Sequence, residues 1–197
     1  MYYHATSFLL SFGITFEPHN PLPFAFNLLP LKSFSLSPQI ITFANCFQKN
    51  KEMSKAIIKT EKGDMTVEFY DQDAPNTVAN FKKLAKSNFY DNVIFHRVIP
   101  NFMVQGGDPT GTGAGGAGYK IDCELTGENQ YHDRGVLSMA HAGRNTGSSQ
   151  FFICHSRANT AHLDRNHTVF GKVIENVDVV DAIRQGDKIL TIEVIEE

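Results

Sequence analysis

Residues 95–109 read FHRVIPNFMVQGGDP. Apolar residues alternate through this stretch as they do in a strand with one buried face, yet Arg97 stands among them. By alternation, Arg97 shares a face with Phe95 and Ile99. The pattern alone leaves two alternatives open: an arginine on the solvent side of an edge strand, or an arginine that a functional site requires beside an apolar surface.

The segments on both sides of this stretch are expected to form two helices and further short strands. Two helices are expected: one within 73–91, with Asp73 as its cap and Pro75 in its first turn, and one within 176–187 that ends at Gly186. Many short strands without β-α-β alternation favour an antiparallel barrel or sandwich. The expected strands are a hairpin within 55–71 that turns at Gly63, followed by 93–99, 102–106, 135–140, 150–155, 168–174 and 188–197.

Composition narrows the class of protein. A net charge of -3 over 197 residues argues against a nucleic-acid partner, because such proteins cluster lysine and arginine on one surface. No apolar run reaches the ~20 residues of a membrane span. Cys46, Cys123 and Cys154 form no C-x-x-C pair, so we expect reduced thiols and a cytoplasmic protein, with Cys123 and Cys154 buried.

The first 52 residues differ in composition from the rest. They hold eight of the sixteen phenylalanines and five of the eight prolines, but one glycine and no arginine. We expect residues 1–52 to be a disordered extension, or sequence upstream of a working start at Met53, and 53–197 to be the domain. An organelle-targeting peptide is the less favoured alternative, because such peptides are rich in arginine.

Three motifs of known chemistry are absent or misplaced. The glycine-rich segment 111–118 contains G-x-G-x-x-G but opens no helix and has no Walker lysine, so a mobile surface loop is favoured over a nucleotide site. The six histidines of the domain lack the H-x-x-x-H spacing of a zinc site. Ser148 and Ser149 stand outside any G-x-S-x-G elbow, which favours a polar turn over a nucleophile.

Three blocks carry a resemblance to a known family. They are FHRVIPNFMVQGGDPTGTGAGG (95–116), GVLSMAHAGRNTGSSQFFI (135–153) and HLDRNHTVFGKVI (162–174). Together they resemble the cyclophilins, the cyclosporin-binding class of peptidyl-prolyl cis-trans isomerases, from about Lys55 to Ile195. The resemblance implies a mainly β fold, a closed eight-stranded antiparallel barrel capped by two helices, with the active groove on its outer surface.

The resemblance also assigns residues. The catalytic residue of the family falls on Arg97, and the residue that helps hold it falls on Gln105. His162 stands where many members have tryptophan, which weakens the cyclosporin binding that the family implies. The remaining substrate-binding positions form the proline pocket, its rim, a second groove glutamine and the edge that pairs with the substrate backbone: Phe102, Met103, Phe152, Leu163, His167, Gln150, Ala140, His141 and Ala142.

The implied activity is rotation about X–Pro peptide bonds in unfolded or flexible proteins, without a cofactor or a metal. Amide resonance sets a rotational barrier of ~18–20 kcal/mol, and the twisted amide regains a lone pair on nitrogen that a nearby cation can bind. This chemistry gives Arg97 a purpose. The alternative is a proline-peptide binding module or chaperone with little turnover. We expect a monomer without a membrane partner.

Overall fold

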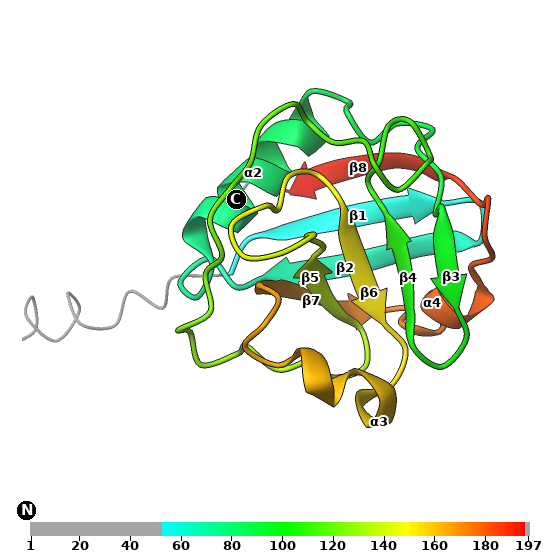
Figure 1. Cartoon of the computed structure of the whole chain (residues 1–197). Helices are drawn as coiled ribbons and strands as arrows, with labels where there is room; N and C mark the ends of the chain where they lie inside the picture. The colour runs from blue at the N-terminus through cyan, green and yellow to red at the C-terminus, as the bar shows by residue number, and fades with distance from the viewer. Residues whose placement is uncertain (1–52, 196–197) are drawn as a thin grey trace, which may run out of the picture. The chain divides into compact units, whose positions relative to one another are not determined.

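The structure, a computed structural model, describes residues 53–195 (Figure 1). The predictions about residues 1–52 therefore lie outside the described residues. Within 53–195, no helix is long and apolar enough to cross a membrane.

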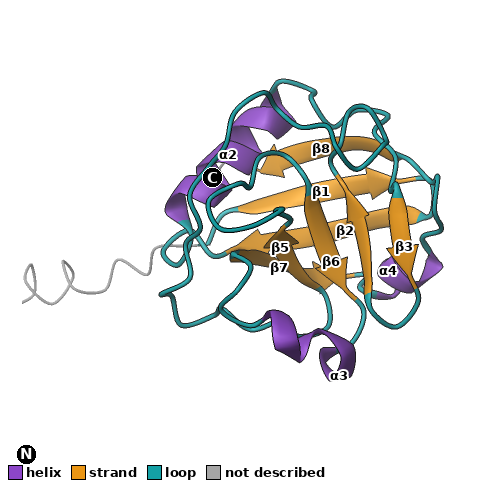
Figure 2. Cartoon of the chain, in the orientation of Figure 1, coloured by secondary structure: helices purple, strands orange, loops and turns teal. Residues whose placement is uncertain are grey.

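The described residues form one curled sheet of eight strands, in which every pair of neighbours is antiparallel (Figure 2). The order of strands across the sheet is β3-β4-β6-β5-β7-β2-β1-β8. Every predicted strand is present, and the hairpin turns as expected, with Gly63 at a φ of 130°. The strands are β1 Lys55–Thr60, β2 Gly63–Phe69, β3 Arg97–Ile99, β4 Met103–Gly106, β5 Val136–Met139, β6 Phe151–Cys154, β7 Val169–Glu175 and β8 Ile189–Ile195.

The sheet is an open half-barrel, so the prediction of a closed barrel was wrong. Its edge strands, β3 and β8, form no ladder with each other; one isolated bridge, Ile94 to Lys188, joins the segments that precede them. Left-handed turns at Asn92 (φ 61°) and Gly186 (φ 94°) come just before these segments. The backbone bonds between the two edges are confined to residues 93–95 and 186–189, although β8 itself continues to Ile195.

One long helix covers part of the sheet. Helix α2, Pro75–Lys86, lies beside β8 in Figure 1 and begins at the predicted proline. Asp73 does not cap it, which corrects the prediction, because the carboxylate of Asp73 accepts a bond from the Asn129 N–H (2.6 Å). The helix N-terminus is instead satisfied by Glu124, whose carboxylate accepts the N–H groups of Asn76 (3.0 Å) and Thr77 (2.8 Å).

The other helices are short. The second predicted helix is only α4, Asp178–Ala182, because Ile183 is already extended. A further α3, Arg157–Thr160, continues into the 3-10 turn η1, Ala161–Leu163. Seven residues are too few for an apolar period of 3.6 to be visible, which is why sequence reasoning missed them. The side chain of Thr160 donates to the His132 carbonyl (2.6 Å) and fixes this segment.

Two apolar clusters lie on opposite faces of the sheet. The larger is built around stacked and edge-on aromatic rings, with Phe81 of α2 in contact with rings from β2, β6 and β7, and it also contains Phe95. Ile99 packs against the smaller cluster instead. The predicted common face of Arg97, Phe95 and Ile99 is therefore wrong at Phe95, because β3 begins only at Arg97.

Candidate active site

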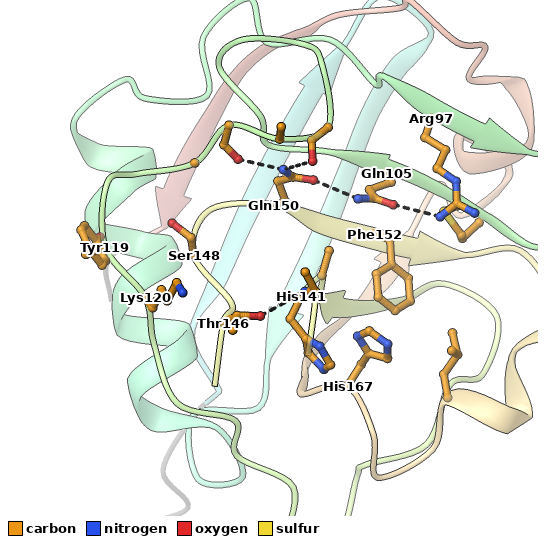
Figure 3. Close-up of a pocket in the computed structure, with 18 of the residues that line it drawn as sticks. Arg97, Gln105, Tyr119, Lys120, His141, Thr146, Ser148, Gln150, Phe152 and His167 are labelled. Carbon is orange, nitrogen blue, oxygen red and sulfur yellow. Dashed lines mark hydrogen bonds between the residues drawn. The ribbon is translucent and has the colours of Figure 1, made fainter. Parts of the chain in front are cut away.

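The register of the sheet brings Arg97 and its predicted partners into one row. Arg97 on β3 lies opposite Gln105 on β4, Gln105 lies opposite Phe152 on β6, and Phe152 lies opposite Ser138 on β5. Directly paired residues point to the same face of a sheet. The close-up shows Arg97, Gln105 and Phe152 of this row together with the labelled residues around them (Figure 3).

The smaller apolar cluster forms the floor beside this row. Met103 and Phe152 are 2% and 5% exposed, and Val136, Cys154 and Val169 lie buried behind them. Phe102, Ala140 and Leu163 pack against its edge. A floor of this kind accepts a small apolar ring and removes water from it.

A groove of about 580 Å³ opens over this floor. Eleven of the twelve residues that the resemblance assigns line it, and Arg97 shares it with the apolar floor. His162 is the exception: its ring stacks on Phe102 with centroids 5.8 Å apart, and it does not line the groove. The eleven are Arg97, Phe102, Met103, Gln105, Ala140, His141, Ala142, Gln150, Phe152, Leu163 and His167.

Sequence reasoning missed the second half of the groove. The glycine-rich segment, read as a surface loop, supplies part of the wall, and three residues with hydroxyl side chains, Tyr119, Thr146 and Ser148, also line the groove. The segment YKIDCEL (119–125), which alternates like a strand, pairs with the rest of the protein as a strand at Ile121 alone, where an isolated bridge reaches Gly147. The run of glycines was the one signal available, since a backbone without side chains can approach a ligand closely. The missed lining residues are Gly113–Gly116, Gly118, Tyr119, Lys120, Thr146 and Ser148.

A chain of hydrogen bonds connects this glycine loop to the arginine. The Gln150 amide donates to the carbonyl oxygens of Gly113 (2.9 Å) and Gly115 (2.8 Å). Gln105 donates to the Gln150 oxygen (2.9 Å), and Arg97 donates to the Gln105 oxygen over a long 3.5 Å. The guanidinium is exposed and only lightly tied, so it retains donors for a ligand (Figure 3).

Two stacked imidazoles form the opposite rim. The rings of His141 and His167 lie 4.0 Å apart, and the Nδ1–H of His167 donates to the Met139 carbonyl (3.2 Å). Burial, and then the neighbouring His141, lower the pKa of His167 to about 4. His167 is therefore neutral at pH 7, with its Nε2 lone pair free to accept.

Buried His132 supports the floor from behind. Its ring stacks on Phe152 with centroids 5.8 Å apart, Nε2 lies 2.9 Å from the Ser138 hydroxyl, and Nδ1 lies 3.2 Å from Asp164. Burial lowers the pKa of His132, and the Asp164 carboxylate opposes that shift. Its position fixes the Phe152 ring.

The serine, cysteine and metal-ligating side chains on which other classes of enzyme depend are not arranged as catalytic groups in the described residues. Ser149 is buried and donates to the Gly107 carbonyl (2.7 Å), while Ser148 accepts the Ala117 N–H (2.9 Å). Cys154 is buried, as expected, but Cys123 is only half-buried, which corrects that prediction. Among residues 53–195, no group of histidine, cysteine and acidic side chains could hold a metal ion.

Comparison with known proteins gives one consistent answer. The model of the family "Cyclophilin type peptidyl-prolyl cis-trans isomerase/CLD" matches residues 55–195. A peptidyl-prolyl cis-trans isomerase of Synechococcus elongatus is 55% identical, over 74% of this chain and 99% of its own. The isomerase B of Bacillus subtilis is 54% identical, over 61% of this chain and 82% of its own.

Solved structures agree with the sequence comparisons. The crystal structure of a Cryptosporidium parvum cyclophilin type isomerase superposes with a TM-score of 0.68 at 34% identity, over 74% of this chain and 99% of its own. That isomerase was also crystallised in the presence of the dipeptide Ala-Pro. The fold, the groove and these matches together place the chain in the family of cyclophilin-type peptidyl-prolyl cis-trans isomerases.

Proposed function

We propose that this groove binds exposed X–Pro segments of unfolded or flexible proteins and that Arg97 is the catalytic residue that drives rotation of the X–Pro bond. The observation that carries the proposal is the position of an exposed guanidinium at the mouth of a groove whose floor is Met103 and Phe152. No covalent bond has to break in this reaction. A site without an evident nucleophile therefore suits it.

The proline ring would lie on the apolar floor, between Phe102 and Leu163. Backbone groups near His141, on the edge from Ala140 to Ala142, would pair with the residues that flank the proline. With one side of the amide held, the carbonyl side is free to turn. As the amide twists, its nitrogen becomes a hydrogen-bond acceptor, and Arg97 donates to it more strongly than to the planar ground state.

An acceleration of isomerisation by five decades requires a larger reduction of the barrier than the Arg97 hydrogen bond alone can supply. Shortening a half-time of ~100 s to about a millisecond lowers the barrier by roughly 7 kcal/mol, at 1.36 kcal/mol per decade. One hydrogen bond to a charged group contributes about 1.5–3 kcal/mol. Immobilising the ring, removing water and holding the backbone must contribute the rest.

The substrate class follows from the same groove. The Ala-Pro dipeptide of the Cryptosporidium parvum crystals has the ring and amide for which this floor and arginine are suited. The alternative of a binding module with little turnover is not favoured, because the matched relatives are named isomerases.

A protease-coupled assay on an Ala-Pro tetrapeptide tests the proposal. Wild-type protein should accelerate isomerisation, and Arg97→Ala should lose about ten- to a thousand-fold in kcat/KM. The fold should remain, because the Arg97 side chain is exposed and makes one long hydrogen bond. Full activity in the variant would refute the catalytic role, and loss of the folded state would mean a structural one.

A further inference from the structure

We propose that Asp108 is a positioning residue for the isomerase reaction, which acts through the glycine loop 110–116 and two glutamines to fix the orientation of the acceptor that Arg97 faces. The inference rests on the catalytic role proposed for Arg97. It also gives the glycine-rich motif a function in the reaction, beyond its place in the wall of the groove.

Asp108 is the anchor of the loop. Asp108 is 1% exposed and lies two residues after the end of β4, and the loop folds around its carboxylate. One oxygen accepts the N–H (2.7 Å) and the hydroxyl (2.8 Å) of Thr110; the other accepts the N–H groups of Gly113 (2.6 Å) and Gly115 (3.1 Å). Burial alone would raise the pKa of Asp108, but these bonds outweigh it and lower the pKa to about 2. The Asp108 carboxylate is therefore negatively charged at neutral pH.

The glycines are required by this wrapping. Gly113 has a φ of 86°, in the left-handed region that glycine adopts without strain. A Cβ on Gly115 would overlap the Asp108 carboxylate and lie within 3 Å of the Thr110 side chain. A loop of larger residues could not bring two N–H groups onto one oxygen in this way. The same wrapping turns the carbonyl groups of Gly113 and Gly115 toward Gln150.

These two carbonyls determine which way the Gln150 amide points. Its NH₂ group donates to both, which leaves only its oxygen to face Gln105. Gln105 must then present NH₂ to Gln150 and its own oxygen to Arg97. If the loop carbonyls moved away, Gln150 could rotate by 180°, Gln105 would follow, and an NH₂ group would face a guanidinium that can only donate.

The consequence for catalysis is a defined position of the guanidinium. With an oxygen beside it, Arg97 is held by one weak bond on the side of Gln105 and keeps its other donors for the prolyl nitrogen. With an NH₂ group beside it, the guanidinium is pushed away from the row. Displacing a reacting group by about 1 Å can cost as much as a hundred-fold in rate.

A double-mutant cycle tests this coupling. In Asp108→Asn, one anchoring oxygen becomes an NH₂ that cannot accept from the loop, so kcat/KM on the Ala-Pro tetrapeptide should fall by about ten-fold, mainly in kcat. In an Arg97→Ala background the same substitution should change the remaining activity by less than about two-fold, because a coupled pair is not additive. Asp73→Asn is the matched control, since that carboxylate also accepts a loop N–H but lies outside the groove.

A second variant and a spectroscopic measurement keep the test decisive if Asp108→Asn folds poorly. Gln150→Met has nearly the same length but lacks both the NH₂ group that donates to the two loop carbonyls and the oxygen that accepts from Gln105, and it should show the same dependence on Arg97. In ¹⁵N NMR spectra, the side-chain NH₂ signals of Gln105 should shift in Asp108→Asn and remain in place in Asp73→Asn.

The outcomes separate the two proposals. Normal activity in Arg97→Ala would refute the catalytic role and this inference with it. A large loss in Arg97→Ala, together with an equal Asp108→Asn effect in both backgrounds, would refute the inference alone, because the loop would then act independently of the arginine. Unshifted Gln105 signals would also overturn it.

Discussion

The neutral His167 at the rim of the groove makes a quantitative prediction about stability and pH. Its pKa of about 4 compares with 6.5 for an unperturbed histidine, and burial is the main cause. As the pH falls below 6.5, the unfolded chain takes up a proton at this position while the folded protein resists until about pH 4. The free energy of unfolding therefore decreases over this window, and above pH 7 His167 has no effect.

The size of the decrease follows from the exposure of the ring. At 1.36 kcal/mol per pKa unit, complete burial would give roughly 3 kcal/mol between pH 7 and pH 4. Because the side chain is only partly buried, solvent screening reduces this to about 1.5 kcal/mol. Removing the histidine should remove that part of the pH dependence and leave the contribution of the acidic residues.

The measurement is urea unfolding of the wild type and His167→Gln at pH 7 and pH 4. The wild type should lose about 1.5 kcal/mol more than the variant on acidification. Parallel losses in wild type and His167→Gln would show that the imidazole is solvated, and the reasoning about burial would fail.

Three further predictions concern other parts of the domain. Phe152→Ala removes the floor of the groove and should raise KM about ten-fold or more while lowering the free energy of unfolding by about 2–4 kcal/mol, measured by progress curves and urea unfolding. Glu124→Ala should cost about 1–2 kcal/mol of stability in the same urea experiment, because the N-terminus of α2 loses two acceptors, with kcat/KM unchanged. Burial raises the pKa of Cys154 to about 12, so iodoacetamide at pH 8 should modify Cys123 and spare Cys154 in peptide maps of the folded protein; rapid alkylation of Cys154 would contradict its burial.

The elements that sequence reasoning recovered are those with a local signal. The strands carry period-2 alternation, and α2 carries both helical spacing and a proline at its start. The cap of α2 could not be read locally, because Glu124 comes from a loop 47 residues beyond Thr77. The opening of the sheet could not be predicted either, because it depends on how far two edges that are distant in the sequence pair with each other.

The groove also has one part that could be predicted from the sequence and one part that could not. Its apolar floor and arginine lie within recognisable blocks of sequence, and all but His162 of the assigned residues line one cavity. The wall formed by the glycine loop could not be predicted, because its shape comes from five hydrogen bonds to the single carboxylate of Asp108. The orientation of each glutamine amide likewise depends on partners that only the folded chain brings together.

The bridge between the two sheet edges has a consequence for synthesis of the chain. The N–H of Phe95, two residues before Arg97, donates to the Asp187 carbonyl (2.8 Å), and the Phe95 carbonyl accepts from Gly186 (3.0 Å). Those partners come more than ninety residues later in the chain. The segment that leads into β3 therefore lacks these bonds until Gly186 and Asp187 have been synthesised, and a nascent chain stalled before Gly186 should have no isomerase activity even when its central strands are already paired.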